Sequence, residues 1–121
     1  MIHIALDAMG GDHAPQAEVQ GVAQALAELP PSFVVQLVGR TAAIEASLAQ
    51  HPSVDRARVQ IVEAPDVVGM GEKPLQAIRS KPNSSIAIGL GLQKQDQSDA
   101  FISAGNTGAV MAASTLILRL H

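Results

Sequence analysis

Two glycine-rich segments contain the residues whose types and spacing are best suited to chemistry. The first segment, residues 7–15, combines two carboxylates, two adjacent glycines and one histidine. Adjacent glycines let backbone N–H groups approach an anion closely, and a histidine is a candidate general acid or base or a donor to an oxyanion. The candidate residues here are Gly10, Gly11, Asp12 and His13. Their types are equally compatible with a tight turn, in which Asp12 caps the next helix and Asp7 braces the loop.

The second segment, residues 103–109, reads Ser-Ala-Gly-Asn-Thr-Gly-Ala. Its glycines free the backbone, and its Ser, Asn and Thr side chains offer hydrogen-bond donors. The N–H groups at the start of the following helix would add a partial positive charge that suits phosphate. The candidate residues are Ser103, Gly105, Asn106, Thr107 and Gly108. The structural alternative is a helix cap with glycines that serve packing, and the segment does not match a Walker A loop.

A third stretch begins at residues 70–74 and supplies cations. Lys73, Arg79 and Lys81 follow one another closely, and Ser84 comes just after them. These residues are candidates to lie near an anionic ligand. The alternative is that the cations are solvated at the surface and that Ser84 caps a helix. No HExxH pattern or carboxylate cluster in the sequence indicates a metal site.

The hydrophobic pattern predicts strands that alternate with helices. Strands are expected over residues 2–7, 33–38, 58–63 and 100–103. Helices are expected over residues 15–29, 41–51, 74–81, 84–94 and from 109 onward. Such alternation is typical of the α/β class with a mostly parallel sheet. Both glycine-rich segments follow a strand and open a helix, and ligands of open parallel sheets bind at the carboxyl ends of the strands.

Composition narrows the class of protein. The chain has 121 residues, of which 47% are hydrophobic and 16% charged, and its net charge is −3. These values exclude disorder of the whole chain and indicate one folded domain with an aliphatic core. Scattered basic residues indicate no nucleic-acid binding, and the absence of cysteine excludes disulfides and thiolate metal sites. The N-terminus does not resemble a signal peptide, and no apolar run approaches the ~20 residues of a membrane span.

The C-terminal helix is an unusual feature of the pattern. From residue 109 it is apolar almost all round, and a helix of this kind needs other structure to cover it. We therefore expect that the chain is the N-terminal part of a longer protein, or that this helix is buried in an oligomer.

Three segments of the chain resemble motifs of the PlsX family of bacterial phosphate acyltransferases. Residues 7–15 resemble the N-terminal signature of that family, residues 70–85 its second motif and residues 99–109 its third. The three motifs occur in the order of the family and together cover the whole chain. The set is therefore far more specific than any one motif.

The resemblance implies a three-layer α/β/α sandwich of the isocitrate/isopropylmalate dehydrogenase type, related to phosphotransacetylases. Family members are much longer, so residues 1–121 would be the N-terminal portion of one acyltransferase domain, truncated at its C-terminus. The implied reaction passes a long-chain acyl group from acyl carrier protein to inorganic phosphate. A glycerol-3-phosphate acyltransferase would then use the acyl phosphate in phospholipid synthesis. The resemblance also implies a cytoplasmic homodimer with peripheral membrane contact, no metal and no cofactor.

This interpretation gives the candidate residues roles. The predicted catalytic residues are His13, Asp12 and Asn106. His13 would assist proton movement or stabilise the oxyanion, and Asp12 would orient it. Lys81 and Arg79 would offset the charge of phosphate or of the carrier protein. The predicted phosphate-binding residues are Gly10, Gly11, Lys81, Ser84, Ser103, Gly105, Thr107 and Gly108.

Other interpretations stay open. One is an enzyme of the phosphotransacetylase kind, which would use acyl-coenzyme A as its donor. Another is a non-catalytic module that binds a phosphate-bearing ligand or acyl carrier protein. A dehydrogenase is a weaker third alternative, because the chain contains no GxGxxG dinucleotide fingerprint.

Overall fold

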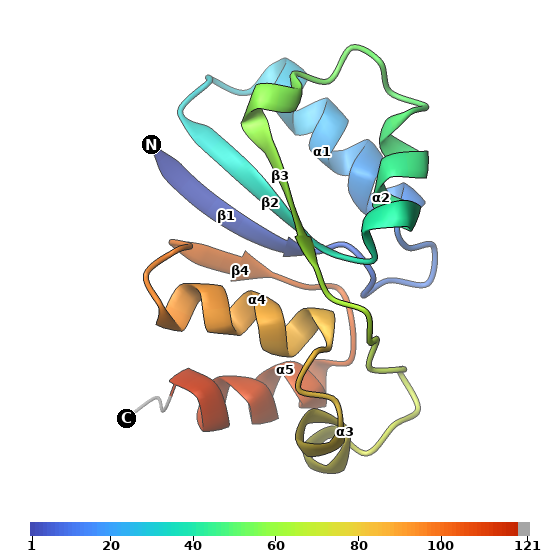
Figure 1. Cartoon of the computed structure of the whole chain (residues 1–121), viewed down its shortest axis with the longest axis vertical. Coiled ribbons are helices and arrows are strands. Elements are labelled where there is room, and N and C mark those ends of the chain that lie inside the picture. The colour runs from blue at the N-terminus through green and yellow to red at the C-terminus, as the bar shows by residue number, and fades with distance from the viewer. Residues whose placement is uncertain (119–121) are drawn as a thin grey trace.

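The computed structural model describes residues 1–118 and contains a sheet of four parallel strands (Figure 1). The strands are β1 (Ile2–Asp7), β2 (Phe33–Gly39), β3 (Val59–Glu63) and β4 (Ala100–Ile102). Their order in the sheet is β3-β2-β1-β4, so the chain starts at a central strand and builds outward on both sides. All four strands expected from the sequence are present.

Helices connect the strands and cover both faces of the sheet. The helical elements are α1 (Gln16–Glu28), α2 (Thr41–Leu48), η1 (Arg56–Arg58), α3 (Pro74–Ser80), α4 (Ser85–Lys94), α5 (Thr107–Ala113) and the π-helical η2 (Ser114–Leu118). In Figure 1, α1 and α2 lie on one face of the sheet, and α4 and α5 lie on the other. The predicted three-layer α/β/α architecture is therefore confirmed for the part of the chain that the structure describes.

Aliphatic side chains fill the spaces between the layers. Every residue of β2 after Phe33 is buried, as expected for a strand with a neighbour on each side in a parallel sheet. The core under α1 and α2 includes Val19, Val22, Leu37, Ile44 and Leu48. The core on the opposite face of the sheet includes Ala5, Val38, Ala64, Ile88, Leu92 and Phe101.

Two polar side chains determine where α4 and α5 begin. Ser84 Oγ accepts a hydrogen bond from the Ala87 amide at 3.2 Å, which confirms the structural alternative that Ser84 is a helix cap. Asn106 Oδ1 accepts from the Ala109 amide at 3.0 Å. Because of this cap, α5 begins at Thr107, earlier than the position 109 expected from the sequence.

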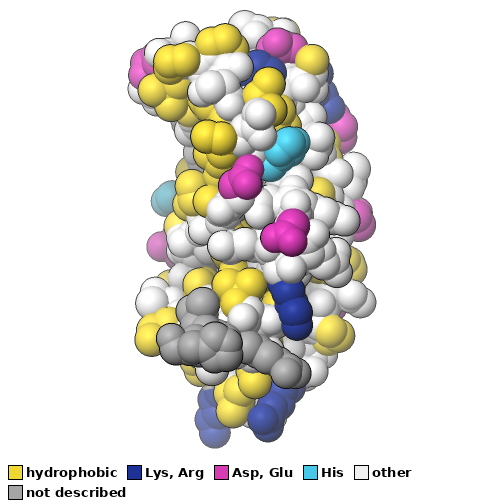
Figure 2. Space-filling model, turned by 90° about the vertical axis from the view of Figure 1, so that its left-hand side faces the viewer, with side chains coloured by type: hydrophobic (Ala, Val, Ile, Leu, Met, Phe, Trp, Pro, Cys, Tyr) yellow, Lys and Arg dark blue, Asp and Glu magenta, His cyan; other side chains and the backbone are white. Residues whose placement is uncertain are grey.

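The last helical segment is only partly covered. Ala109 and Ala113 are buried against α3 and α4, whereas Met111 is 67% exposed and Leu116 is 42% exposed. The end of the predicted helix, residues 119–121, lies outside the described residues. Hydrophobic side chains are also exposed on the side of the molecule that carries the N-terminus (Figure 2). Among residues 1–118, no helix is long and apolar enough to cross a lipid bilayer.

The two glycines inside α4 provide a matched pair of variants. A Cβ on Gly89 would lie 2.6 Å from Cδ1 of Phe101, whereas a Cβ on Gly91 would meet nothing within 4 Å. Alanine favours a helix over glycine by about 1 kcal/mol, so Gly91→Ala should stabilise the protein by up to that amount. Gly89→Ala should instead destabilise it by about 1–3 kcal/mol, because the Phe101 ring must move. Urea denaturation measures both values, and stabilisation by Gly89→Ala would contradict the packing described here.

Candidate functional site

The two glycine-rich segments meet at the carboxyl ends of the neighbouring strands β1 and β4. Asp7 ends β1 and is 1% exposed. Its Oδ1 accepts a hydrogen bond from the Met9 amide at 3.0 Å, and its Oδ2 accepts from Ser103 Oγ at 2.8 Å. Ser103 Oγ in turn accepts from the Gly105 amide at 3.0 Å. The buried carboxylate therefore holds both segments in place, which confirms the part of the structural alternative in which Asp7 braces its loop.

The segments approach so closely that two of the predicted glycines have no room for a side chain. A Cβ on Gly105 would lie 3.1 Å from the carbonyl oxygen of Gly10 and 3.2 Å from its Cα. A Cβ on Gly10 would lie 3.0 Å from the Gly105 amide nitrogen and would collide with the Asp7 carboxylate. Gly10 and Gly105 therefore have a steric role, whatever ligand binds beside them.

A hollow of about 460 Å³ opens beside this contact. The residues that line it are Gly11, Asp12, His13, Ala17, Glu18, Met70 and Ala104. The hollow thus joins the first glycine loop, the loop before α3 and the turn after β4. His13 is exposed, and within the described residues its side chain makes no hydrogen bond to protein, so the imidazole is available to a ligand.

Backbone donors are also available in both glycine segments. In residues 1–118, the amides of Asp12 and His13 donate to no protein acceptor, and neither do those of Thr107 and Gly108 at the start of α5. Free amides in a glycine-rich turn are typical of oxyanion sites. This arrangement supports the prediction that the two segments bind an anion.

Asp12 does not have the structural role considered for it, that of a helix cap. The residue before α1 is Pro15, and no side chain caps that helix, so the alternative in which Asp12 is the cap is wrong. Within the described residues no hydrogen bond joins Asp12 to His13. Asp12 is exposed on the wall of the hollow, and its orienting role remains a prediction without a supporting contact.

Glu18 is a residue of the hollow that the sequence analysis missed. Its Oε2 accepts a hydrogen bond from the Gly11 amide at 3.1 Å. Burial, and to a lesser extent the charge of Asp7, raise the pKa of the Glu18 carboxyl above its usual value, while His13 acts in the opposite direction. The sequence did contain a signal for Glu18, because it is an acidic residue in the first turn of a helix that follows a glycine loop.

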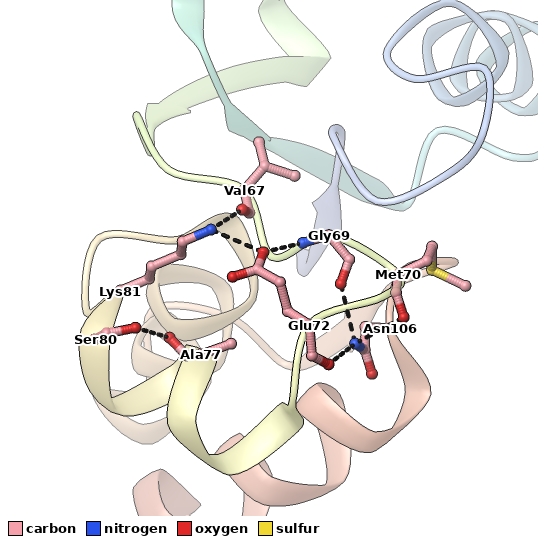
Figure 3. Close-up of polar contacts among 8 residues, drawn as sticks. All are labelled: Val67, Gly69, Met70, Glu72, Ala77, Ser80, Lys81 and Asn106. Carbon is pink, nitrogen blue, oxygen red and sulfur yellow. Dashed lines mark hydrogen bonds and ion pairs between the residues drawn. The ribbon is translucent and has the colours of Figure 1, made fainter.

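Asn106 connects the turn after β4 to the loop before α3 (Figure 3). While its Oδ1 caps α5, its Nδ2 lies 3.1 Å from the carbonyl oxygens of Gly69 and Glu72 and 3.4 Å from that of Met70. The side chain is 6% exposed, and both ends of its amide are occupied by protein. Asn106 thus positions two segments of the site, and this contact could not be read from the sequence.

Lys81 fixes the other side of the same loop (Figure 3). Its Nζ donates to the carbonyl oxygen of Val67 at 2.9 Å and to Glu72 Oε2 at 2.8 Å, and Glu72 also accepts from the Gly69 amide. Lys81 holds the pKa of the Glu72 carboxyl below its usual value. The charge of Lys81 is therefore matched by a carboxylate, and its role in binding phosphate remains a prediction.

The remaining predicted residues are distributed more widely. Ser84 is fully buried as the cap of α4, so its hydroxyl does not face solvent. Gly108 packs against Pro74, and Thr107 is exposed. Lys and Arg side chains gather at the lower end of the molecule in Figure 2, the end where Figure 1 shows α3. The structure therefore brings together the two glycine segments but separates Ser84 from them by burial.

The contacts of Asn106 predict that the stability of the protein is sensitive to substitution at this position. Asn106→Asp keeps an acceptor for the cap but places carboxylate oxygens against three carbonyl groups, so it should cost about 2 kcal/mol or more of stability. Asn106→Ala, which loses both sets of contacts, should cost a similar amount. Thr107→Ala, at the neighbouring exposed position, should change stability by less than about 0.5 kcal/mol. Thermal and urea denaturation test the series, and a neutral Asn106→Asp would contradict the bonding shown in Figure 3.

The Lys81–Glu72 pair predicts a pH dependence. Because the pKa of Glu72 is lowered from 4.5 in the folded state, its contribution to stability is present above that value and is lost as the pH falls through the lowered pKa. An NMR titration of the Glu72 side chain should give a value below 4.5 in the wild type. In Lys81→Met the value should rise, and an unchanged titration would show that the pair does not form.

A family described as "Fatty acid synthesis protein" matches residues 2–121. Over 116 residues the chain is 51% identical to the phosphate acyltransferase of Salinibacter ruber and 47% identical to those of Ectopseudomonas mendocina and Stutzerimonas stutzeri. Each match covers 96% of this chain but only 32–34% of the relative, so the chain spans about a third of the length of these curated relatives. The match includes both glycine segments and the loop between them, and the chain belongs to the fatty acid synthesis protein family.

Proposed function

We propose that this chain supplies the phosphate-binding part of a phosphate acyltransferase, which transfers a long-chain acyl group from acyl carrier protein to inorganic phosphate. The observation that carries the proposal is the hollow of about 460 Å³, where the first glycine loop, the loop before α3 and the turn after β4 meet. Family membership supports the coarser assignment to acyl transfer in fatty acid and phospholipid synthesis.

The reaction defines what the site must do. A phosphate oxygen attacks the carbonyl carbon of a thioester, a C–O bond forms, the C–S bond breaks, and the departing thiolate takes up a proton. The protein must therefore hold phosphate against one face of the carbonyl group and supply donors to the oxyanion that develops. It must also place a proton donor near the sulfur.

The residues around the hollow fit these requirements to different degrees. His13 is the proposed proton donor or oxyanion stabiliser, since its free imidazole lies on the wall of the hollow. The amides of Asp12 and His13, together with those of Thr107 and Gly108, are the proposed phosphate donors. For Asn106, predicted as catalytic, we propose a positioning role, because its amide already bonds to three carbonyl groups.

The identity of the donor and the assembly belong to the same proposal. Acyl carrier protein as donor, a cytoplasmic homodimer and peripheral membrane contact are what the resemblance of the three motifs implies. Residues 1–121 would form the N-terminal portion of one larger domain, an interpretation supported by the 34% of the Salinibacter ruber relative that the match covers. The acyl phosphate would pass to a glycerol-3-phosphate acyltransferase.

A chimera tests the proposal directly. The matched third of the Salinibacter ruber relative is replaced by this chain, and acyl phosphate formation is assayed with acyl carrier protein and acyl-coenzyme A donors side by side. Turnover with the carrier protein thioester is the expected result. Turnover only with acyl-coenzyme A would identify the phosphotransacetylase alternative. A folded chimera that binds phosphate without turnover would identify the non-catalytic module.

The role of His13 gives a sharper prediction in the same chimera. His13→Ala should lower turnover at least about tenfold, because a general acid or oxyanion donor typically contributes 10²–10⁴-fold. His51→Ala, which alters a histidine outside the hollow, is the matched control and should leave turnover unchanged. Circular dichroism checks that both variants fold. Full activity of folded His13→Ala would remove His13 from the mechanism.

A further inference from the structure

The hollow proposed to take phosphate has a carboxylate in its wall. Glu18, in the first turn of α1, lines the hollow together with Gly11 and His13. Its Oε2 accepts a hydrogen bond from the Gly11 amide at 3.1 Å, so it occupies a donor that the glycine loop would otherwise offer to an anion. An anion that binds beside Gly11 would therefore lie next to the Glu18 side chain.

The charge of Glu18 is not neutralised by a fixed cation. Within residues 1–118 the ion pairs are Arg56–Glu45 and Lys81–Glu72, and Glu18 takes part in neither. The titratable groups that face it are Asp7, at the end of β1, and His13, in the glycine loop. Its second oxygen, Oε1, is buried and has no hydrogen-bond partner among the described residues, so an anion in the hollow would approach the carboxylate at Oε2. An ionised carboxylate in this setting favours a neighbour that brings a proton over one that brings only negative charge.

Phosphate and sulfate differ in whether they carry a proton near neutral pH. Inorganic phosphate keeps at least one proton near neutral pH, and its hydroxyl can donate to a carboxylate. Sulfate has a similar shape but carries no proton and a full double negative charge. Repulsion by a nearby carboxylate grows with the charge of the anion, and a site that hydrogen-bonds a hydroxyl rejects the analogue that lacks it.

We propose that Glu18 is a specificity-determining residue, which makes this hollow accept protonated phosphate and reject sulfate. Its backbone is fixed, because the adjacent Val19 is fully buried in the core under α1. The carboxylate therefore cannot leave the wall of the hollow without disturbing its hydrogen bond to Gly11. The inference rests on the proposed function, since it requires phosphate to bind in this hollow.

Anion titrations of the purified protein test the proposal. Dissociation constants for inorganic phosphate and for sulfate are measured by calorimetry at a single pH, for the wild type and for Glu18→Gln. This substitution keeps an oxygen that can accept from the Gly11 amide and removes the charge. The wild type should bind phosphate at least about tenfold more tightly than sulfate, and Glu18→Gln should bind sulfate about tenfold more tightly than the wild type does.

Glu28→Gln is the matched control. It removes the same charge from the same helix at an exposed position outside the hollow, so the preference for phosphate should be unchanged. An unchanged preference in folded Glu18→Gln would overturn the inference and leave the proposed function intact. Absence of binding of either anion by the wild type would overturn both.

A measurement on the wild type alone guards against variants that fail to fold. In an NMR titration, phosphate should shift the Gly11 amide resonance, and sulfate at the same concentration should shift it far less. Equal shifts by the two anions would overturn the proposal. Glu18→Ala offers a second variant, which should also lose the preference for phosphate if it folds.

Discussion

The site depends on one buried interaction, the hydrogen bond from Ser103 to the Asp7 carboxylate. A carboxylate that is almost fully buried is costly unless it is hydrogen-bonded, and Ser103 and the Met9 amide supply its partners. Since β1 and β4 are parallel neighbours, this bond joins the two loops that follow these strands. Gly10 and Gly105, in the same two loops, lie in close contact. Two motifs far apart in the sequence thus become one surface.

The third motif joins that surface through side chains that bond to backbone. Asn106 holds the loop before α3 by three of its carbonyl groups, and Lys81 with Glu72 holds the same loop from α3. Asn106 and Lys81, which the sequence indicated as ligand-binding residues, therefore hold the loops in place. Among the described residues, no protein group bonds the His13 imidazole on the wall of the hollow or the free amides of the two glycine segments.

Sequence patterns predicted the elements whose causes are local. The four strands follow from aliphatic runs, and Ser84 is recognisable as a cap because its own neighbours in sequence form the helix. Residues whose roles depend on distant partners were not predictable. The role of the Asn106 amide depends on carbonyl groups in another loop. Glu18 was missed although its place in the first turn of a helix after a glycine loop was an available signal. The capping role considered for Asp12 failed because α1 starts only after Pro15.

The charged side chains around the hollow are mainly carboxylates. Asp12 and Glu18 line it, Asp7 lies behind it, and the charge of Lys81 is matched by Glu72. Fixed cations would attract any dianion, because Coulombic attraction does not distinguish phosphate from sulfate. Backbone amides orient an oxyanion by geometry, and carboxylates beside them favour the anion that brings a proton. Under the proposed function, carboxylates beside free amides would favour selectivity between anions over tight binding.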